Sequence, residues 1–579
     1  MNNIGKVNFV SYDKLSFEIY DFEKLEFNHD GEFYFTKGIL DFVTILNRQN
    51  KKFIYKIEKL ENKEKSLSKE ENAKFEHTAN AICSPIGIIE NDKIDFNLKS
   101  YPFLQDIVFL TNDEEFKIIF NINSKKIVNL GLIDEKFPAD FDINKILTFH
   151  SAILGNTGSG KSTTIRQIIR EILNHNTTNL NLHVFDVHQE YKNNNDKVKQ
   201  VDVLNDYTIP LESLELQDWT NLVKPSDLVQ LPILRMALQL ANAIAEKRIC
   251  EILLKCYLAL NTYKNVQESP LAKRTKILGF LVDTKIDTSK YTSKYGNFDS
   301  VHDETKFINS LEKELDQKGF TFLQAQIENS TYKVCSFDSL LKALDYIYNL
   351  EEAKGNNNAR HYSQTLETRI KEVQSRYSSL FNNKKSEPFS DTNEESINHQ
   401  YHKQVTVYDV SELDDDLLLF FTSYLCKELF NKNKTIKLEN RNINIFLLEE
   451  AHRYISRNKE HSQFYEIEIF RKIAREGRKF GCFLYLSSQR PSELSHTVLS
   501  QCNNHFLHRI KNDIDLEYLS KTIPYIDNNQ LKRLSYLPTG VTYAVGELFP
   551  IPIEIKVKEP TANEDVTKTP TINFSGNMP

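Results

Sequence analysis

The feature that most constrains the fold is the stretch FHSAILGNTGSGKSTTIRQIIRE at Phe149–Glu171. A short apolar run, a glycine turn and a helix-forming run follow one another, which predicts a buried strand, a tight turn and a helix. The turn fits the pattern G-x-x-x-x-G-K-[ST], with its fixed positions at Gly155, Gly160, Lys161 and Ser162. In such a turn, backbone N–H groups and the positive end of the following helix converge on a phosphate group. The stretch predicts an α/β fold built around a nucleotide site.

We expect this turn to hold the phosphates of ATP. Lys161 reaches the β- and γ-phosphates, and the hydroxyl of Ser162 is a ligand for Mg²⁺. The alternative, an ordinary glycine turn, is disfavoured because the chain has only 17 glycines in 579 residues. The residues expected to bind the nucleotide are Gly155, Asn156, Thr157, Gly158, Ser159, Gly160, Lys161, Ser162 and Thr163.

A second group of candidate residues follows the predicted strand Asn442–Glu449, which is apolar at almost every position after its start. Such a strand belongs to a parallel sheet that is covered on both faces. It ends in Glu449 and Glu450, where carboxylates can serve an ATP site. We assign Glu450 as the general base that activates water and Glu449 as the acid on the metal side. The alternative is a polar strand end that caps the next helix.

Three arginines have helical spacing in Glu466–Phe480: Arg471, Arg475 and Arg478. One of them could be an arginine finger, a guanidinium inserted from a neighbouring subunit to stabilise charge on the transferred phosphoryl group. The alternative is a solvated basic face that pairs with acids on the same helix.

Two other strands also end in polar residues. The predicted strand Cys482–Ser488 is followed by Gln489, which could sense the γ-phosphate by hydrogen bonding. The strand Leu180–Val187 contains Asp186 at its end. His188, Glu190 and Tyr191 follow it. These polar groups could orient water or Mg²⁺, or they could cap a turn, and the sequence leaves these two open.

The N-terminal region has short alternating runs separated by turn residues, which predict a small β-barrel. We interpret its aromatic residues as barrel interior rather than as a stacking platform for single-stranded nucleic acid. The polar run Glu61–His77 predicts a solvated loop.

Helical periodicity runs from about Asp206 to Tyr401 and predicts a helical insertion, with loops at Thr288–Thr305 and Asn382–Lys403. The α/β pattern then resumes, and a β pair is expected at Gly540–Gly546 and Ile551–Val557. The expected parts are a barrel at 1–135, a core at 136–205, the insertion at 206–402, the rest of the core at 403–540, and the β pair with a polar tail at 541–579.

The charge balance excludes a protein that coats polyanions over its whole surface. The chain carries 73 Lys and Arg against 80 Asp and Glu, a net charge of −7, so a nucleic-acid contact must come from a local basic surface. The seven cysteines include no C-x-x-C pair, which indicates neither a zinc site nor a disulfide framework. No apolar run reaches the length of about 18 residues typical of a membrane span, and we expect a cytoplasmic location.

Six segments together resemble the HerA branch of the HerA/FtsK superfamily: GNTGSGKS, VFDVHQEY, FLLEEAHRYI, AREGRKFG, LSSQRPSELSHTVLSQC and HFLHRI. The chain departs from that family's pattern at Val187, where the family often has proline. The resemblance implies a RecA-like core in a hexameric ring that translocates double-stranded DNA, with ATP bound between subunits. It also implies that Arg475 is the arginine acting in trans and that the barrel docks a partner, either a NurA-like nuclease or, in antiviral islands, a sirtuin-like or other effector.

Two functions follow as hypotheses. The first is an ATP-hydrolysing motor that translocates duplex DNA and works with such a partner. Antiphage defence is one role that this motor could serve. The second is an assembly scaffold whose ATP-driven ring organises and activates a defence effector, with DNA movement secondary. Transporter-type ATPases and GTPases are disfavoured, because the chain contains neither L-S-G-G-Q nor N-K-x-D.

Overall fold

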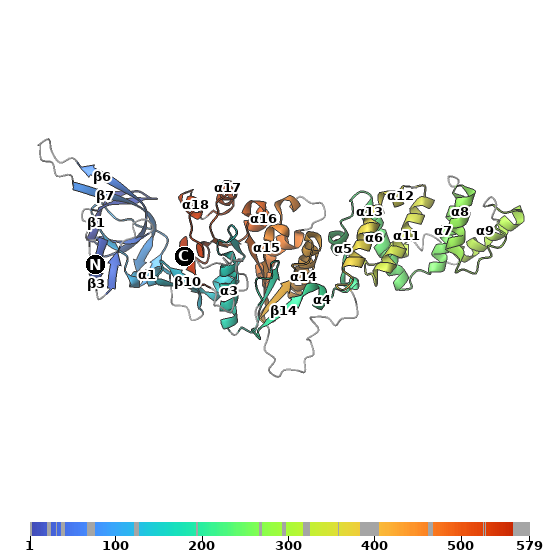
Figure 1. Ribbon diagram of the computed structural model, residues 1–579, viewed down its shortest axis with the longest axis horizontal. Coiled ribbons are helices and arrows are strands. Elements are labelled where there is room, and N and C mark those ends of the chain that lie inside the picture. The colour runs from blue at the N-terminus through green and yellow to red at the C-terminus, as the bar shows by residue number, and fades with distance from the viewer. Residues whose placement is uncertain are drawn as a thin grey trace, which may run out of the picture. The chain divides into compact units, whose positions relative to one another are not determined.

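The computed structural model divides the chain into two compact units (Figure 1). Unit 1 takes residues 1–175, 489–492 and 500–561, and unit 2 takes 176–488 and 493–499. The residues that the structure describes are 3–19, 25–29, 32–35, 41–65, 76–120, 127–175, 177–192, 195–265, 269–291, 297–316, 325–356, 358–381, 404–460, 467–524, 526, 528–549 and 551–559.

Unit 1 begins with a closed β-barrel, as predicted. Its strands follow the order β2-β1-β9-β5-β6-β7, and pairing of β2 with β7 closes the circle. The short strand β8 extends from β7, and β3 pairs with β4 in a separate hairpin. The strands are β1 Asn3–Val10, β2 Leu15–Ile19, β3 Glu26–His29, β4 Glu32–Phe35, β5 Phe42–Leu46, β6 Lys52–Lys65, β7 Glu76–Glu90, β8 Lys93–Asp95 and β9 Ile107–Leu110.

Side chains fill the barrel. Alternate residues of the strands point inward and form one apolar cluster, so the interior interpretation of the aromatic residues is confirmed for this cluster. Its fully buried members include Val7, Phe17, Phe53, Tyr55 and Val108.

The loop predicted at Glu61–His77 is wrong at both ends. The strands β6 and β7 stay paired out to Lys65 and Glu76. Of the predicted loop, residues 66–75 lie outside the described residues. A β ladder is held by backbone groups, so a two-stranded ribbon can continue through a charged sequence that has no core to bury.

The rest of unit 1 carries a second set of strands in the order β11-β10-β20-β19-β18-β12. Strand β12 runs parallel to β18, whereas the other pairs are antiparallel. The β pair expected near the C-terminus is present as β19 and β20. The elements are α1 Asp113–Phe120, β10 Ile127–Ile133, β11 Phe137–Asp142, α2 Ile143–Leu147, β12 Ser151–Leu154, α3 Lys161–Asn174, β18 Asn504–Leu507, α17 Asp513–Thr522, α18 Asn528–Leu534, β19 Val541–Gly546 and β20 Ile553–Val557.

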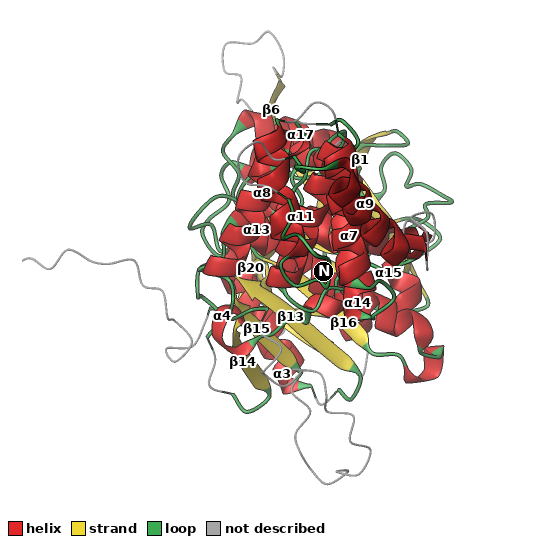
Figure 2. Ribbon diagram, turned by 90° about the vertical axis from the view of Figure 1, so that its right-hand side faces the viewer, coloured by secondary structure: helices red, strands yellow, loops and turns green. Residues whose placement is uncertain are grey.

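Unit 2 contains a parallel sheet with the strand order β17-β16-β13-β15-β14, and Figure 2 shows β16, β13, β15 and β14 side by side. Every residue of β17 is buried, and β16 is buried after its first residue, as expected for a sheet covered on both faces. Its elements are β13 Leu180–Asp186, β14 Val198–Asp202, β15 Val405–Asp409, α14 Asp415–Thr435, η3 Leu438–Asn440, β16 Ile443–Leu448, η4 Ala451–Arg453, η5 Arg457–Lys459, α15 Glu468–Phe480, β17 Cys482–Ser488 and α16 His496–Leu499.

The predicted insertion between β14 and β15 is helical (Figure 1). Within it, α11 packs against α6, and α7 packs against α8 and α9. Among the described helices, none combines the length and the apolar character needed to cross a bilayer. The elements are α4 Val203–Asp206, η2 Leu211–Ser213, α5 Leu216–Val223, α6 Gln230–Ala245, α7 Glu251–Lys264, α8 Pro270–Leu281, α9 Val301–Asp316, α11 Phe337–Ala353, α12 Ala359–Tyr362 and α13 Gln364–Arg376.

The loop predicted at Thr288–Thr305 is wrong in its last part, because α9 begins at Val301. The segment also contributes to a core. Tyr291 is 2% exposed and stacks on Phe298 and Phe307, with ring centroids 4.8 and 5.8 Å apart. Scattered aromatic residues in a polar sequence thus build a small cluster that periodicity does not reveal. The other predicted loop, Asn382–Lys403, lies outside the described residues.

Candidate active site

The glycine turn of unit 1 connects β12 to α3, as predicted. Gly160 is the N-cap residue of α3, with φ of +114°, and having no side chain it does not cap the first turn of the helix. The N–H groups at this helix end are therefore left for a ligand, and an anion is the ligand that a helix N-terminus favours. Thr157 and Gly158 are exposed at the tip of the turn.

The side chain of Lys161 lies inside the turn and is 8% exposed. Its Nζ atom donates to the carbonyl oxygens of Gly155, at 2.8 Å, and Asn156, at 3.2 Å. The turn thus holds one positive charge beside its backbone N–H groups. Ser162, the next residue, is half-buried in the first turn of α3.

The turn lies too close to its surroundings to accept side chains at two glycines. A Cβ atom on Gly155 would lie 2.6 Å from Cβ of His508, and one on Gly160 would lie 2.9 Å from Cα of Gly540. Backbone and neighbours therefore form a tight cradle with exposed N–H groups and one ammonium, and this donor set fits the phosphates of ATP.

We expect Gly160→Ala to lower the free energy of unfolding by about 2–4 kcal/mol, because it combines an unfavourable φ with a backbone clash. The matched control is Gly158→Ala. Gly158 also has a positive φ, of +68°, but a Cβ there meets no described atom within 4 Å. The control should cost about 1 kcal/mol. Denaturant titration of both variants measures the difference, and equal losses would contradict the cradle.

His508 packs against the cradle, and sequence reasoning alone assigns it no role. Its Nδ1 lies 3.0 Å from the carbonyl oxygen of Val541 and its Nε2 lies 2.9 Å from Oγ1 of Thr164. Burial, and next the charge of Lys161, lower the pKa of His508 to about 3, so the ring is neutral at pH 7. A neutral ring donates from Nδ1 to the carbonyl and accepts from the threonine hydroxyl. A histidine just after an apolar strand was the available signal.

Gln489 follows β17 and reaches the glycine turn. Its Oε1 accepts a hydrogen bond from Oγ1 of Thr157. An amide at the tip of a phosphate-binding turn is placed to contact a nucleotide. Its role as a γ-phosphate sensor remains a prediction.

The other predicted residues lie in unit 2, at the carboxyl ends of β13 and β16. Glu449 is 4% exposed. Its carboxylate accepts from the N–H of Val187, at 2.9 Å, and from the hydroxyl of Tyr191, at 3.3 Å. Asp186 accepts from the N–H groups of Glu190, at 3.0 Å, and Tyr191, at 2.9 Å. Of the two roles left open for Asp186, these bonds favour capping of the turn.

Glu449 and Asp186 place two carboxyl groups where water is largely excluded. Burial, and next the neighbouring charges of Asp186 and Glu190, raise the pKa of Glu449 to about 8. Burial also raises the pKa of Asp186. Two buried carboxyl groups this close favour holding one proton between them. A divalent cation would favour the ionised form of Glu449, which is compatible with the metal-side role predicted for it.

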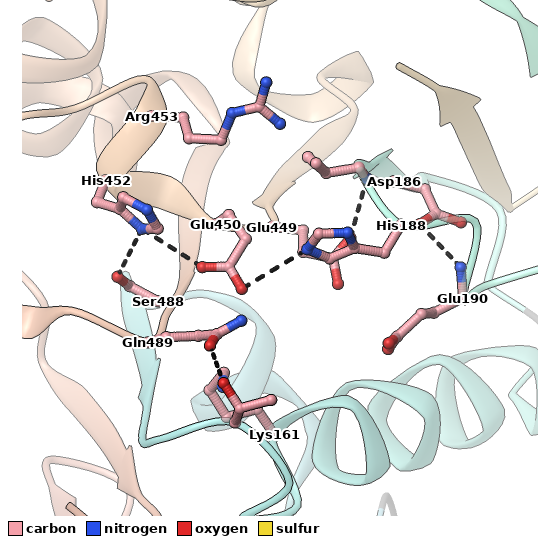
Figure 3. Close-up of polar contacts among 12 residues, drawn as sticks. Lys161, Asp186, His188, Glu190, Glu449, Glu450, His452, Arg453, Ser488 and Gln489 are labelled. Atoms are coloured by element: carbon pink, nitrogen blue, oxygen red, sulfur yellow. Dashed lines mark hydrogen bonds and ion pairs between the residues drawn. The ribbon is translucent and has the colours of Figure 1, made fainter. Parts of the chain in front are cut away.

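Glu450 is 6% exposed and lies between two histidines (Figure 3). Its Oε2 is 3.3 Å from Nδ1 of His452, and its Oε1 is 3.9 Å from Nε2 of His188. The backbone of Glu450 is left-handed, with φ of 48° and ψ of 51°, and its side chain does not cap η4. The capping alternative is therefore not supported. A non-glycine residue in this conformation costs about 1 kcal/mol, and such strain collects at functional sites.

His452 belongs to the motif FLLEEAHRYI, from which sequence reasoning alone assigns it no role. Its Nδ1 also lies 3.2 Å from Oγ of Ser488, the last residue of β17 (Figure 3). The imidazole thus connects the carboxylate of Glu450 to the end of the neighbouring strand. The signal was its position two residues after Glu450, where a short turn brings both side chains to one edge of the sheet.

The three candidate arginines differ in their surroundings on α15. Arg471 is half-buried, and its Nη1 lies 3.7 Å from Oε2 of Glu468, so the pairing proposed as the alternative is present for this residue. Arg475 and Arg478 are exposed. Arg475 forms no ion pair or hydrogen bond with any described residue.

A phosphate cradle at the start of a helix and a buried parallel strand that ends in two acids define a P-loop ATPase. The model of one protein family, "Helicase HerA, central domain", matches residues 127–429, which is more than half of the chain. The chain therefore belongs to the HerA helicase family, and it is an ATPase.

The chain is also similar to individual proteins. The chain is 26% identical to a probable DNA double-strand break repair helicase HerA of Methanocaldococcus jannaschii, over 82% of this chain and 84% of that protein. It is 24% identical to the DNA double-strand break repair helicase HerA of Saccharolobus solfataricus, over 77% of this chain and 71% of that protein. A solved structure of VirB4 of Thermoanaerobacter pseudethanolicus matches with a TM-score of 0.43 and 14% identity, covering 76% of this chain and 99% of that one.

Proposed function

We propose that the chain is an ATP-hydrolysing motor that binds and translocates double-stranded DNA as a homo-hexameric ring. The observation that carries the ATPase part is the phosphate cradle, with Lys161 inside it and α3 uncapped. The DNA part is supported by relatives that are named DNA double-strand break repair helicases. The family resemblance also supports a partner enzyme on the barrel, a NurA-like nuclease or a sirtuin-like defence effector.

In this proposal each residue has one task. The N–H groups of the turn and Lys161 bind the β- and γ-phosphates. The hydroxyl of Ser162 would be a ligand for Mg²⁺, Glu449 would be the acid on the metal side, and the metal ion would neutralise charge on the phosphates. Glu450 accepts the proton of the attacking water. Gln489 contacts the γ-phosphate, and Arg475 of a neighbouring subunit stabilises the charge that develops on it.

The test of the motor is the ATPase rate of the purified protein with and without duplex DNA, together with displacement of a third strand from a triplex. We expect DNA to stimulate hydrolysis several-fold and hydrolysis to drive displacement. An ATPase that is indifferent to duplex DNA would contradict the proposal.

The arginine assignment is tested by mixing subunits. Arg475→Ala and Glu450→Gln should each lower hydrolysis by at least about 10²-fold, because each removes one half of a shared site. Mixed rings contain interfaces where an intact Glu450 meets an intact Arg475, so mixing should restore part of the rate. Arg478→Ala, an exposed arginine on the same helix, is the matched control. If every mixture stays inactive while native mass shows intact rings, Arg475 does not act in trans, and rescue confined to Arg478→Ala would transfer the role to that residue.

A further inference from the structure

Three cations surround a pair of aromatic rings, one on α14 and one on α15 of unit 2. Phe430 and Phe480 meet edge to face, with ring centroids 5.3 Å apart. Nζ of Lys434 lies 4.8 Å from the centroid of Phe430 and 5.4 Å from that of Phe480. The guanidinium of Arg441 lies 5.4 Å from Phe480, and Nζ of Lys472 lies 5.8 Å from Phe430. We call Lys434, Arg441 and Lys472 the basic cluster.

The basic cluster has an excess of positive charge. Within the described part of the chain, none of its three side chains forms an ion pair with a carboxylate. Partial desolvation, and next the like charge of Lys472, lower the pKa of Lys434, while the exposed Glu476 acts in the opposite direction. Exposed Lys437 and Lys479 flank the basic cluster in the sequence. The acid between Lys434 and Arg441 is Glu439, which is also exposed. The repulsion among these cations would fall on contact with a polyanion.

Stabilisation of helix ends accounts for only part of the arrangement. Cations near a helix C-terminus interact favourably with its dipole, which explains Lys434 in the last turn of α14. Arg441 donates to the carbonyl oxygen of Lys479 in the last turn of α15. Lys472, however, lies in the first half of α15, where no helix end accounts for it. Tertiary packing brings the three charges together.

The basic cluster is separate from the residues assigned to hydrolysis in unit 2. Arg441 lies just before the amino end of β16, and α15 ends just before the amino end of β17. Glu449 and Glu450 follow the carboxyl end of β16. The basic cluster therefore lies at the opposite edge of the same parallel sheet.

We propose that the basic cluster binds the phosphate backbone of duplex DNA. This inference rests on the proposed function, which requires a DNA contact in a chain whose net charge is −7, and hence a local basic surface. Lysines and an arginine on an apolar platform offer charge without a base-specific hydrogen-bonding pattern. Such groups contact phosphates in any sequence, as a motor that moves along DNA needs.

The test uses the full-length double variant Lys434→Gln/Lys472→Gln. Arg441 is kept because its Nη2 donates to the carbonyl oxygen of Ile436, at 2.9 Å, and so ties the local chain. Binding of a fluorescent duplex is measured by anisotropy over a series of KCl concentrations, without ATP. Each lost phosphate contact lowers the slope of log Kd against log salt concentration by about 0.9. We expect the slope to fall by about 1–2 and Kd at 100 mM salt to rise by about tenfold.

Two further variants isolate the charge at this place. Lys434→Arg/Lys472→Arg keeps the charge and should retain the wild-type slope. Lys285→Gln/Lys290→Gln removes the same charge from exposed residues after α8 and should leave the slope unchanged. Basal ATPase without DNA should stay within about twofold in all three variants.

The inference is overturned if the glutamine double variant binds with the same slope and Kd as the control pair. It is also overturned if native mass shows that this variant has lost its ring, since the cluster would then serve a contact between copies. A wild-type protein that binds no duplex at any salt concentration would instead refute the proposed function.

Discussion

Glu450→Gln is expected to lower kcat for ATP hydrolysis by about 10²–10³-fold while changing nucleotide affinity by less than about threefold. The amide has the same shape as the carboxylate but cannot take a proton from water. Because the left-handed backbone and burial of Glu450 are kept, the fold should be preserved. Steady-state hydrolysis and equilibrium binding of a fluorescent nucleotide measure the two quantities separately.

The control for this variant is Glu517→Gln on α17, an exposed glutamate that pairs with Lys521. It should hydrolyse ATP at the normal rate, since it lies on the surface with one cation. If Glu450→Gln also hydrolyses ATP normally, the general base has been assigned wrongly. A variant that loses nucleotide binding as well would point to a role of Glu450 in structure rather than in proton transfer.

Lys161→Ala is expected to abolish hydrolysis and to weaken ATP binding by about 10–10²-fold. In the structure the ammonium is held by the carbonyl oxygens of Gly155 and Asn156, so it is positioned inside the turn before any phosphate arrives. Its removal leaves the cradle with N–H donors but without a full positive charge. Titration of a fluorescent ATP analogue and the ATPase rate together measure the loss.

Lys145→Ala, an exposed lysine on α2 of the same unit, provides the matched control and should bind ATP normally. Thermal unfolding of both variants checks the fold. Retention of normal ATP affinity in Lys161→Ala would contradict the assignment of the turn as the phosphate site. A fall in melting temperature without a change in affinity would mean that Lys161 has only a structural role in the turn.

Several elements were predicted correctly because their signals are local. The glycine turn and α3 follow from residue types at fixed spacing, and the buried strands β16 and β17 follow from continuous apolar runs. The barrel follows from alternation, since every second side chain of its strands must fill the interior. In each case the information lies within about ten residues of the element itself.

The two incorrect loop predictions concern polar segments whose composition does not indicate their structure. The polar composition of Glu61–His77 predicts a loop, whereas backbone pairing extends β6 and β7 into this run. The polar composition of Thr288–Thr305 predicts a loop, whereas α9 begins at Val301 and Tyr291, Phe298 and Phe307 form an aromatic cluster beside it. Neither arrangement has a period that a sequence window can detect.

The sequence by itself determined which residues could do the chemistry: a turn with Lys161 and Ser162, and a strand ending in Glu449 and Glu450. Only the tertiary structure decided how they are supported. It placed His508 against Thr164, more than 300 positions apart in the chain, and it set His452 between Glu450 and Ser488. Local propensity depends on neighbouring residues, whereas these contacts depend on which strand ends the fold brings to the same edge of a sheet.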